Sequence, residues 1–281
     1  MNIREVIEKG FVELKTSNVS SPRLKARMLM QFVLDKSRQY IVVNDLEELS
    51  KNYLDKYFFY IDKLKNNVPI EHITHHKEFM KLDFYVDENV LIPRQDTEIL
   101  VEEVIDIAKK MGKVKVLDLC TGSGAISVSI AKYVKDVEVY AVDISKKALE
   151  VAKKNAILND CQDKIKFIYS DMFERLDGEK FDIIVSNPPY IEKSKIDKLD
   201  REVQKEPIIA LDGGEDGLDF YREIIKNGYQ YLKYKGYICL EIGYNQKDSV
   251  ISIFSNEEKY ENIYSKKDLY DNDRIVVGRL K

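Results

Sequence analysis

Short apolar runs typical of β-strands alternate with stretches of helical periodicity from residue 114 onward. The strand-like runs lie at 114–119, 137–143, 164–170, 181–186 and 237–242. Helical patterns fill the intervals, at about 124–134, 145–158 and 219–234. Because parallel neighbouring strands need a long crossover, usually a helix, this alternation predicts an α/β fold with a mostly parallel sheet covered on both faces. The final segment, 261–280, predicts two strands joined by a turn at 271–273, which makes the C-terminal strand antiparallel.

The first 66 residues carry the helical period instead. Apolar residues recur at the spacing of one helix face, beginning with Ile3, Val6, Ile7, Phe11 and Leu14. Ser20 and Ser21 before Pro22 predict a helix start, with a hydroxyl cap followed by a proline whose missing N–H is not needed in the first turn. A further helix is expected from about Ser50. The pattern therefore predicts a small helical bundle.

A third pattern separates these two regions. β-Branched and aromatic residues flank Asp87-Glu88-Asn89, which predicts a β-hairpin that turns there and ends at Pro93. Thr97 then opens a helix that closes near Gly112. The expected organisation is a helical domain over 1–75, a β-hairpin linker over 76–95 and a Rossmann-like domain over 96–281.

Composition limits the class of protein. Of 281 residues, 44% are hydrophobic and 33% charged, which supplies a sizeable core and excludes a disordered chain. No apolar run is long enough to span a bilayer, and the N-terminus is charged from its fourth residue, so a cytoplasmic protein without membrane contact is expected. The net charge of −4 gives no support for stable nucleic-acid binding. No metal site is expected, because the only histidines, His72, His75 and His76, stand among charged residues with no cysteine nearby.

A glycine-containing turn follows the first parallel strand and carries the first candidate site. It runs Asp118-Leu119-Cys120-Thr121-Gly122-Ser123-Gly124, and the next helix directs its free N–H groups at it. Asp143 ends the next strand, where a carboxylate accepts hydrogen bonds from a ribose. Asp118 would repel a pyrophosphate but suits the ammonium of an amino acid, which favours S-adenosylmethionine over a dinucleotide.

The strand at 181–186 ends in the second candidate site, Asn187-Pro188-Pro189-Tyr190. The two prolines remove backbone donors and stiffen the loop. The Asn187 side-chain carbonyl and a proline carbonyl can then accept both hydrogens of a planar NH₂ group, while Tyr190 supplies a flat face. This arrangement orients a weakly nucleophilic nitrogen at a methyl donor without a strong base.

With these motifs, the chain resembles the S-adenosylmethionine-dependent methyltransferases that modify planar nitrogens, and more closely the peptide chain release factor glutamine methyltransferases, the PrmC/HemK family. The matching stretches cover nearly the whole chain: VLIPRQDTEIL, DLCTGSGAISVSIA, AVDISKKALEVAKKNA, SDMF, NPPY, EPIIALDGGEDGLDFYR and DNDRIVVGR. The resemblance implies a class I methyltransferase sheet, and methyl transfer to the side-chain nitrogen (N5) of the glutamine in the GGQ motif of release factors, with S-adenosylhomocysteine as product. It also implies that the helical domain docks the release factor, and we expect a monomer.

Residue roles follow from the same resemblance. Residues Cys120 to Gly124 line the methionine part of the cofactor, Asp143 holds its ribose, Met172 lies against adenine, and Asn187 to Tyr190 bind the glutamine amide. Asn187 is also expected to border the cofactor. Three positions depart from the family pattern. Cys120 stands where glycine is frequent, which is tolerable if no positive φ is required; RQDTE replaces RPETE; and Met172 replaces a bulkier aromatic.

Other functions remain open at this point. The NPPY loop could hold the exocyclic amine of adenine, as in an adenine-N6 nucleic-acid methyltransferase, although that enzyme must flip a base and bind phosphates. A nicotinamide-dependent oxidoreductase would use the glycine turn and leave NPPY without a role. A non-catalytic scaffold has no need of Asp118, Asp143 or NPPY, and the helical domain could equally be a cap that stabilises the sheet.

Overall fold

The computed structural model describes residues 1–176 and 178–281. Its internal contacts divide the chain into two compact units. The first unit comprises Met1–His75 together with Asp200–Lys205, and the second comprises His76–Leu199 together with Glu206–Lys281. None of the helices in the described residues is long and apolar enough to cross a membrane.

The first unit is helical, as its apolar periodicity predicts. Its helices are α1 (Ile3–Thr16), α2 (Pro22–Leu34), α3 (Arg38–Val43), α4 (Lys51–Lys65), α5 (Ile70–Thr74) and the short η3 (Val203–Lys205). One apolar face of each of the longer helices packs into a shared core. The predicted hydroxyl cap of α2 is wrong, because Ser21 has a left-handed backbone (φ 48°) and its side chain makes no capping hydrogen bond.

The segment Asp200–Lys205 joins this unit through Lys25, a residue of α2 that is only 7% exposed. The Lys25 ammonium donates to Ser20 Oγ at 2.9 Å and forms an ion pair with Glu202. A buried ammonium needs such a partner, since desolvation without one is expensive. Glu202 is therefore a structural part of the helical unit, although it lies far away in the sequence.

Seven strands of the described chain form the central sheet of the second unit, in the order β5-β4-β3-β6-β7-β9-β8. They are β3 (Val114–Leu119), β4 (Val137–Asp143), β5 (Ile165–Tyr169), β6 (Phe181–Ser186), β7 (Leu232–Glu241), β8 (Tyr260–Lys267) and β9 (Asp273–Leu280). β3 to β7 are parallel, and β9 runs antiparallel between β7 and β8. The predicted Rossmann-like sheet with an antiparallel C-terminal strand is confirmed.

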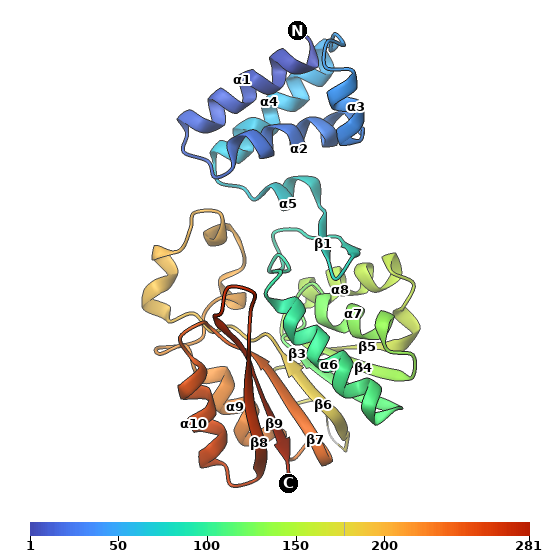
Figure 1. The fold of residues 1–281 in the computed structure, drawn as a ribbon, viewed down its shortest axis with the longest axis vertical. Helices are drawn as coiled ribbons and strands as arrows, with labels where there is room; N and C mark the ends of the chain where they lie inside the picture. Colours follow the sequence, from blue (N-terminus) through green and yellow to red (C-terminus); the bar gives the residue numbers. More distant parts are fainter. Residues whose placement is uncertain (177) are drawn as a thin grey trace. The chain divides into compact units, whose positions relative to one another are not determined.

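Helices cover both faces of this sheet (Figure 1). They are α6 (Thr97–Met111), α7 (Ala125–Tyr133), α8 (Lys146–Leu158), α9 (Asp219–Gly228) and α10 (Lys247–Asn256). The connecting segments of the same unit contain the short η1 (Gln162–Lys164), η2 (Lys193–Lys198) and η4 (Ile208–Ala210). α6 and α7 pack on the face that carries Val116 and Val139, whereas α9 and α10 pack on the face that carries Leu117 and Leu240. Each strand residue therefore meets one of two separate cores according to its parity.

Several predicted boundaries are wrong. The hairpin, β1 (Lys77–Phe79) with β2 (Leu82–Phe84), turns at Met80-Lys81 and not at Asp87-Glu88-Asn89. α9 ends at Gly228, whereas the sequence pattern extends it to 234, and β7 begins earlier than predicted, at Leu232. α10 was not predicted.

The three histidines differ in burial. His72 is buried on α5, whereas His75 and His76 are exposed. The ring of His76 lies 2.8 Å from Asp83 Oδ1 of β2.

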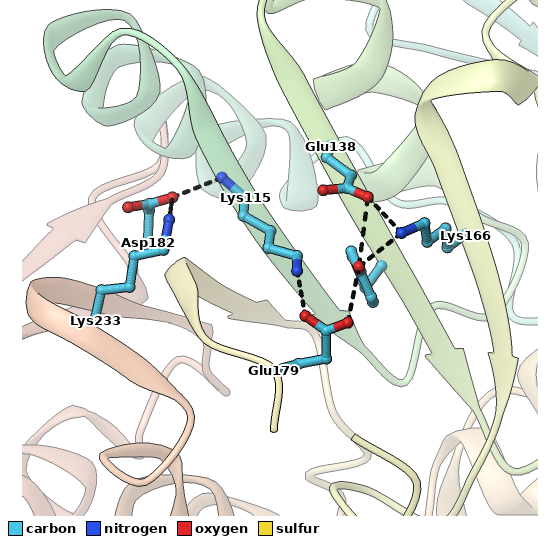
Figure 2. Close-up of polar contacts among 7 residues, drawn as sticks. Lys115, Glu138, Lys166, Glu179, Asp182 and Lys233 are labelled. Carbon is cyan, nitrogen blue, oxygen red and sulfur yellow. Dashed lines mark hydrogen bonds and ion pairs between the residues drawn. The ribbon is translucent and has the colours of Figure 1, made fainter. Parts of the chain in front are cut away.

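Charged side chains tie the strands together at the amino-terminal edge of the sheet (Figure 2). Each of β3, β4, β5 and β6 carries one as its second residue: Lys115, Glu138, Lys166 and Asp182. Asp182 accepts from the Lys115 backbone N–H and from Lys233 Nζ, both at 2.7 Å, while Lys166 pairs with Glu138 at 2.6 Å. Glu179 pairs with Lys115 Nζ. This network links the amino-terminal ends of the strands. Ligands of such sheets bind at the opposite, carboxyl ends of the parallel strands.

Candidate active site

A cavity of about 240 Å³ opens at the carboxyl ends of the parallel strands. Six of the predicted site residues line it: Cys120, Gly122, Asp143, Met172, Asn187 and Pro189. They come from the ends of β3, β4, β5 and β6, so the glycine-containing turn after β3 and the NPPY loop share one cavity. A group bound by the first can therefore reach a group held by the second.

The turn after β3 has an unusual backbone. Cys120, Gly122 and Gly124 all adopt positive φ, at 59°, 55° and 79°. Cysteine was expected to replace glycine at position 120 without strain only if φ were negative. The φ of Cys120 is positive, so a residue with a Cβ adopts the left-handed conformation here. Its sulfur lies 4.0 Å from that of Met172, and this contact places both side chains on the cavity wall.

Asp118 stabilises this turn through buried hydrogen bonds. The carboxyl group is fully buried, and its Oδ2 accepts hydrogen bonds at 2.6 Å from the hydroxyls of Thr121 and Ser127. Burial raises the pKa of Asp118 to about 7, against the opposing effect of those two hydroxyls. Its Oδ1 has no hydrogen-bond partner among the described residues. Asp118 is not among the residues that line the cavity, and neither are Thr121, Ser123 and Gly124 of this turn or Pro188 and Tyr190 of the NPPY loop.

Asp143 links the turn to the end of β4. Its two carboxylate oxygens accept from the backbone N–H groups of Gly122 and Ser145, each at 2.8 Å. Burial raises the pKa of Asp143, and these backbone donors oppose the rise. Asp143 lines the cavity and each of its oxygens has a second lone pair, so the carboxylate can still accept from a diol.

The NPPY loop is fixed by contacts on three sides. Ser186 Oγ donates to the Leu119 carbonyl at 2.7 Å, Asn187 Nδ2 donates to Thr97 Oγ1 at 3.2 Å, and the Tyr190 carbonyl accepts from Gln246 Nε2 at 3.0 Å. Glycines of the DGGEDG stretch allow the close packing, since a Cβ on Gly213 would lie 2.7 Å from Tyr190 Cα. Burial raises the pKa of Tyr190 well above its ordinary value, so the phenol stays neutral.

Glu206 connects the segment before α6 to the segment that contains η4. Its carboxylate accepts from the Ile92 backbone N–H at 2.9 Å and from Arg94 at 2.5 Å. The charge pair joins the LIPR stretch before α6 to the EPIIA stretch, which contains η4. The cavity residues that these stretches supply, among them Leu91 and Ile209, are thereby held in place.

The sequence reasoning missed several residues of the cavity. They are Asn89, Val90, Leu91, Val142, Ile144, Ser145, Ala148, Ser170, Asp171, Pro207, Ile209, Ala210 and Phe220. Asp171 precedes Met172 in the SDMF motif, so the motif itself was the available signal. Leu91 and Ile209 belong to stretches recognised as family-like, but nothing in their residue types indicated a place in the site.

Two known protein families match this chain, one in the helical region and one in the sheet region. Residues 5–74 match the PrmC N-terminal domain, and residues 95–210 match the methyltransferase small domain. A release factor glutamine methyltransferase of Clostridium acetobutylicum is 45% identical over 99% of this chain and 98% of its own length. One of Clostridium botulinum is 38% identical over 99% of both chains. The chain belongs to the release factor glutamine methyltransferase family.

Solved structures support the fold of this family member. The catalytic domain of hMettl16, in complex with the MAT2A 3′UTR hairpin 6, matches with a TM-score of 0.60 at 16% identity, over 77% of this chain and 81% of that one. A methyltransferase from Pyrococcus furiosus matches with a TM-score of 0.52 at 16% identity, over 72% and 91% of the two chains. At such identities the likeness concerns the fold alone.

Proposed function

We propose that this protein transfers a methyl group from S-adenosylmethionine to the side-chain amide nitrogen (N5) of the glutamine in the GGQ motif of peptide chain release factors, in the cytoplasm and as a monomer. The observation that carries the proposal is the shared cavity, in which Asn187 and Pro189 of the NPPY loop face the same space as Cys120, Gly122 and Asp143. Full-length relatives named for this activity support it.

The lining of the cavity suits the proposed cofactor. Among the described residues that line it are the carboxylates Asp143 and Asp171 but no lysine or arginine. A pyrophosphate would meet uncompensated negative charge there, whereas a sulfonium and an ammonium would be stabilised. Bound S-adenosylmethionine supplies an electrophilic methyl group. Asp143 would hold the ribose, Met172 with Ile144 would pack against adenine, and the turn at 120–124 would hold the methionine part. This charge pattern disfavours the nicotinamide alternative.

The NPPY loop would do the work on the substrate. An amide nitrogen is a weak nucleophile because its lone pair is conjugated with the carbonyl. Asn187 Oδ1 and the Pro188 carbonyl would accept the two amide hydrogens, while Tyr190 would form a wall parallel to the amide plane. The nitrogen is then aligned for attack, and its proton becomes acidic only after the new N–C bond forms, so no strong base is required.

Substitution of Asn187 by alanine tests this assignment. Loss of one acceptor that is aligned with the reacting group should lower methyl transfer about 10²–10³-fold. Binding of S-adenosylhomocysteine, measured by calorimetry, should change little, because it depends on the turn after β3 and on Asp143. Near-normal turnover of Asn187→Ala on a release factor would contradict the assignment.

The substrate itself is tested by mass spectrometry of a release factor co-expressed with the protein. A methyl group on the GGQ glutamine is the expected result. The rival substrate is adenine in a nucleic acid, and labelled S-adenosylmethionine incubated with DNA, RNA or a release factor separates the two. Incorporation into nucleic acid alone would overturn the proposal; the net charge of −4 argues against that outcome.

The helical domain, residues 1–75, would dock the release factor. Its surface carries a groove of about 210 Å³ lined by Arg4, Arg23, Arg27 and Arg38. Arg4 and Arg23 are already paired with Asp45 and Glu8, which leaves Arg27 and Arg38 to meet an acidic partner. Val42 and Val43 are exposed beside it, at 66% and 79%.

Charge reversal tests this docking role in the intact protein. Arg27→Glu with Arg38→Glu should raise KM for a whole release factor but leave KM for a short GGQ peptide unchanged. Equal effects on both substrates would instead favour a domain that only stabilises the fold.

A further inference from the structure

Glu241 is a buried carboxyl group at the same edge of the sheet as the NPPY loop. It is the last residue of β7, which pairs with β6, and it is 1% exposed. Its backbone carbonyl accepts from the Tyr221 hydroxyl at 3.0 Å, while its Oε2 has no hydrogen-bond partner among the described residues. A carboxyl group placed so deeply is expensive, which calls for a reason beyond packing.

Glu241 lies beside a hydrogen bond between Thr97 and Asn187. Asn187 Nδ2 donates to Thr97 Oγ1 at 3.2 Å, and Thr97, the first residue of α6, is only 4% exposed. The pairing of Ser186 with Leu240 places Asn187 next to Glu241, and the hydrogen-bonding groups of Thr97 and Asn187 both lower the pKa of the Glu241 carboxyl group. The amide nitrogen of Asn187 is therefore turned to the protein side.

We propose that Thr97 and Glu241 are positioning residues, which hold Asn187 with its amide nitrogen turned into the protein and its Oδ1 turned toward the substrate amide. This inference rests on the proposed function, because it specifies how the NPPY loop presents its acceptor. Neither residue need touch the glutamine.

The direction of the Asn187 amide follows from which atoms can donate. An ionised carboxylate only accepts, so the single hydroxyl proton of Thr97 goes to Glu241 and the Thr97 oxygen is left to accept from Asn187. A flipped Asn187 would direct Oδ1 at the Glu241 carboxylate and at the lone pairs of Thr97, which is repulsive. It would also present an NH₂ group to the NH₂ of the substrate. Thr97 and Glu241 thus exclude the flipped orientation of the Asn187 amide, in which Asn187 could not accept a hydrogen bond from the substrate.

Protonation of Glu241 would remove this selectivity. A neutral carboxyl group can donate a hydrogen bond, and so can satisfy a flipped Asn187. Burial raises the pKa of Glu241 to about 7, while Thr97, Arg274 and Asn187 lower it and Asp96 raises it. The phenols of Tyr190 and Tyr221 also face this carboxyl group and stay neutral, since burial raises the pKa of each. Arg274 of β9 remains charged, so among the groups around Asn187 it is Glu241 that titrates near neutrality.

A matched pair of variants tests the role of the hydroxyl. Thr97→Val keeps the shape of the side chain and removes the hydroxyl, and should lower kcat about 10- to 100-fold. Thr97→Ser keeps the hydroxyl and should restore kcat to within about threefold of wild type, an allowance for the lost methyl group. Melting temperature and S-adenosylhomocysteine affinity serve as controls. A Thr97→Val enzyme that folds, binds cofactor and turns over like Thr97→Ser would overturn the inference.

The pH profile of kcat tests the carboxyl group, and a merely structural role would not move it. At saturating S-adenosylmethionine, wild-type kcat should rise as pH increases through about 7. Glu241→Gln cannot ionise, so its kcat should be lower at pH 8 and nearly flat over this range. An unchanged profile in Glu241→Gln would overturn the assignment. If wild type fails to methylate any release factor, the proposed function fails instead; normal wild-type activity with insensitive variants defeats only this inference.

Discussion

Single residues in the turn after β3 are under steric constraints that differ sharply between neighbours. Gly124 is the N-cap of α7 and has a φ of 79°, and a Cβ there would lie 2.9 Å from the Cβ of Ala152 on α8. Gly122 also has positive φ, but a Cβ on it would meet nothing closer than the Cys120 carbonyl at 4.0 Å. A side chain at either position would thus strain the backbone, whereas only a side chain at Gly124 would also clash with a neighbouring helix.

Alanine at these two positions should therefore have unequal effects. Gly122→Ala should cost about 1 kcal/mol of unfolding free energy, from the left-handed backbone alone. Gly124→Ala adds a clash between α7 and α8, so its cost should reach about 2–4 kcal/mol. Urea denaturation of both variants measures the difference. Equal losses would mean that the contact with Ala152 does not limit this turn.

Elements beside the cavity are held together by a few buried polar side chains. Asn155 of α8 accepts from the Tyr85 backbone N–H at 2.7 Å and donates to the carbonyls of Tyr85 and Ser123 at 2.9 and 2.8 Å. One fully buried amide therefore joins the segment after β2, the glycine turn and α8. All three partners are backbone groups, for which this side chain supplies hydrogen bonds inside the protein.

Asn155→Ala should be among the most destabilising substitutions in the sheet unit. Three hydrogen bonds to the backbone are lost, at about 1 kcal/mol each, so a loss of about 3 kcal/mol is expected. The neighbouring Lys153 is exposed, and Lys153→Ala should change stability by less than about 0.5 kcal/mol. Thermal and urea unfolding of the two variants provide the comparison, and similar values for both would contradict the tethering role.

How well the sequence predicted each element depends on where its signal lies. The strands β3, β4 and β6 were located to the residue, because their apolar runs and the following turns are local features. The hairpin turn was misplaced because Met80 and Lys81 adopt positive φ with no glycine or asparagine to announce it. Tertiary contacts fix that turn: the Met80 N–H donates to Glu98 at 2.7 Å, and its carbonyl accepts from the Tyr133 hydroxyl.

The residues of the candidate active site also divide into those with a local sequence signal and those placed by tertiary contacts. The glycine turn and NPPY carry their chemistry in consecutive residues, so residue types alone placed them. Thr97 and Glu241 reach Asn187 from α6 and β7, and nothing near them in the sequence points to it. Contacts of that kind appear only when the sheet order is known.

At the scale of the whole molecule, two buried carboxyl groups couple stability to pH. Burial raises the pKa of both Asp118 and Glu241 to about 7. An unfolded chain has carboxyl pKa values near 4. Between about pH 4 and pH 7 the folded protein therefore binds more protons than the unfolded one, and its free energy of unfolding falls as pH rises through that window.

The cofactor-free protein should thus be less stable at pH 8 than at pH 5.5 by a few kcal/mol from these two groups. Asp118→Asn and Glu241→Gln remove the proton uptake, so each should flatten the pH dependence of the unfolding free energy measured in urea. Other groups titrate as well, so the comparison is between slopes. Variant slopes equal to that of wild type would show that neither carboxyl group is protonated in the folded state.

The ion pair between Lys25 and Glu202 has a consequence for modularity. Because Asp200–Lys205 belongs to the helical unit, the chain passes from one unit to the other after residues 75, 199 and 205. The helical unit is therefore discontinuous in the gene, and exchanging residues 1–75 between relatives would replace Lys25 without replacing Glu202. A working chimera has to carry both pieces, so the two segments should be inherited together.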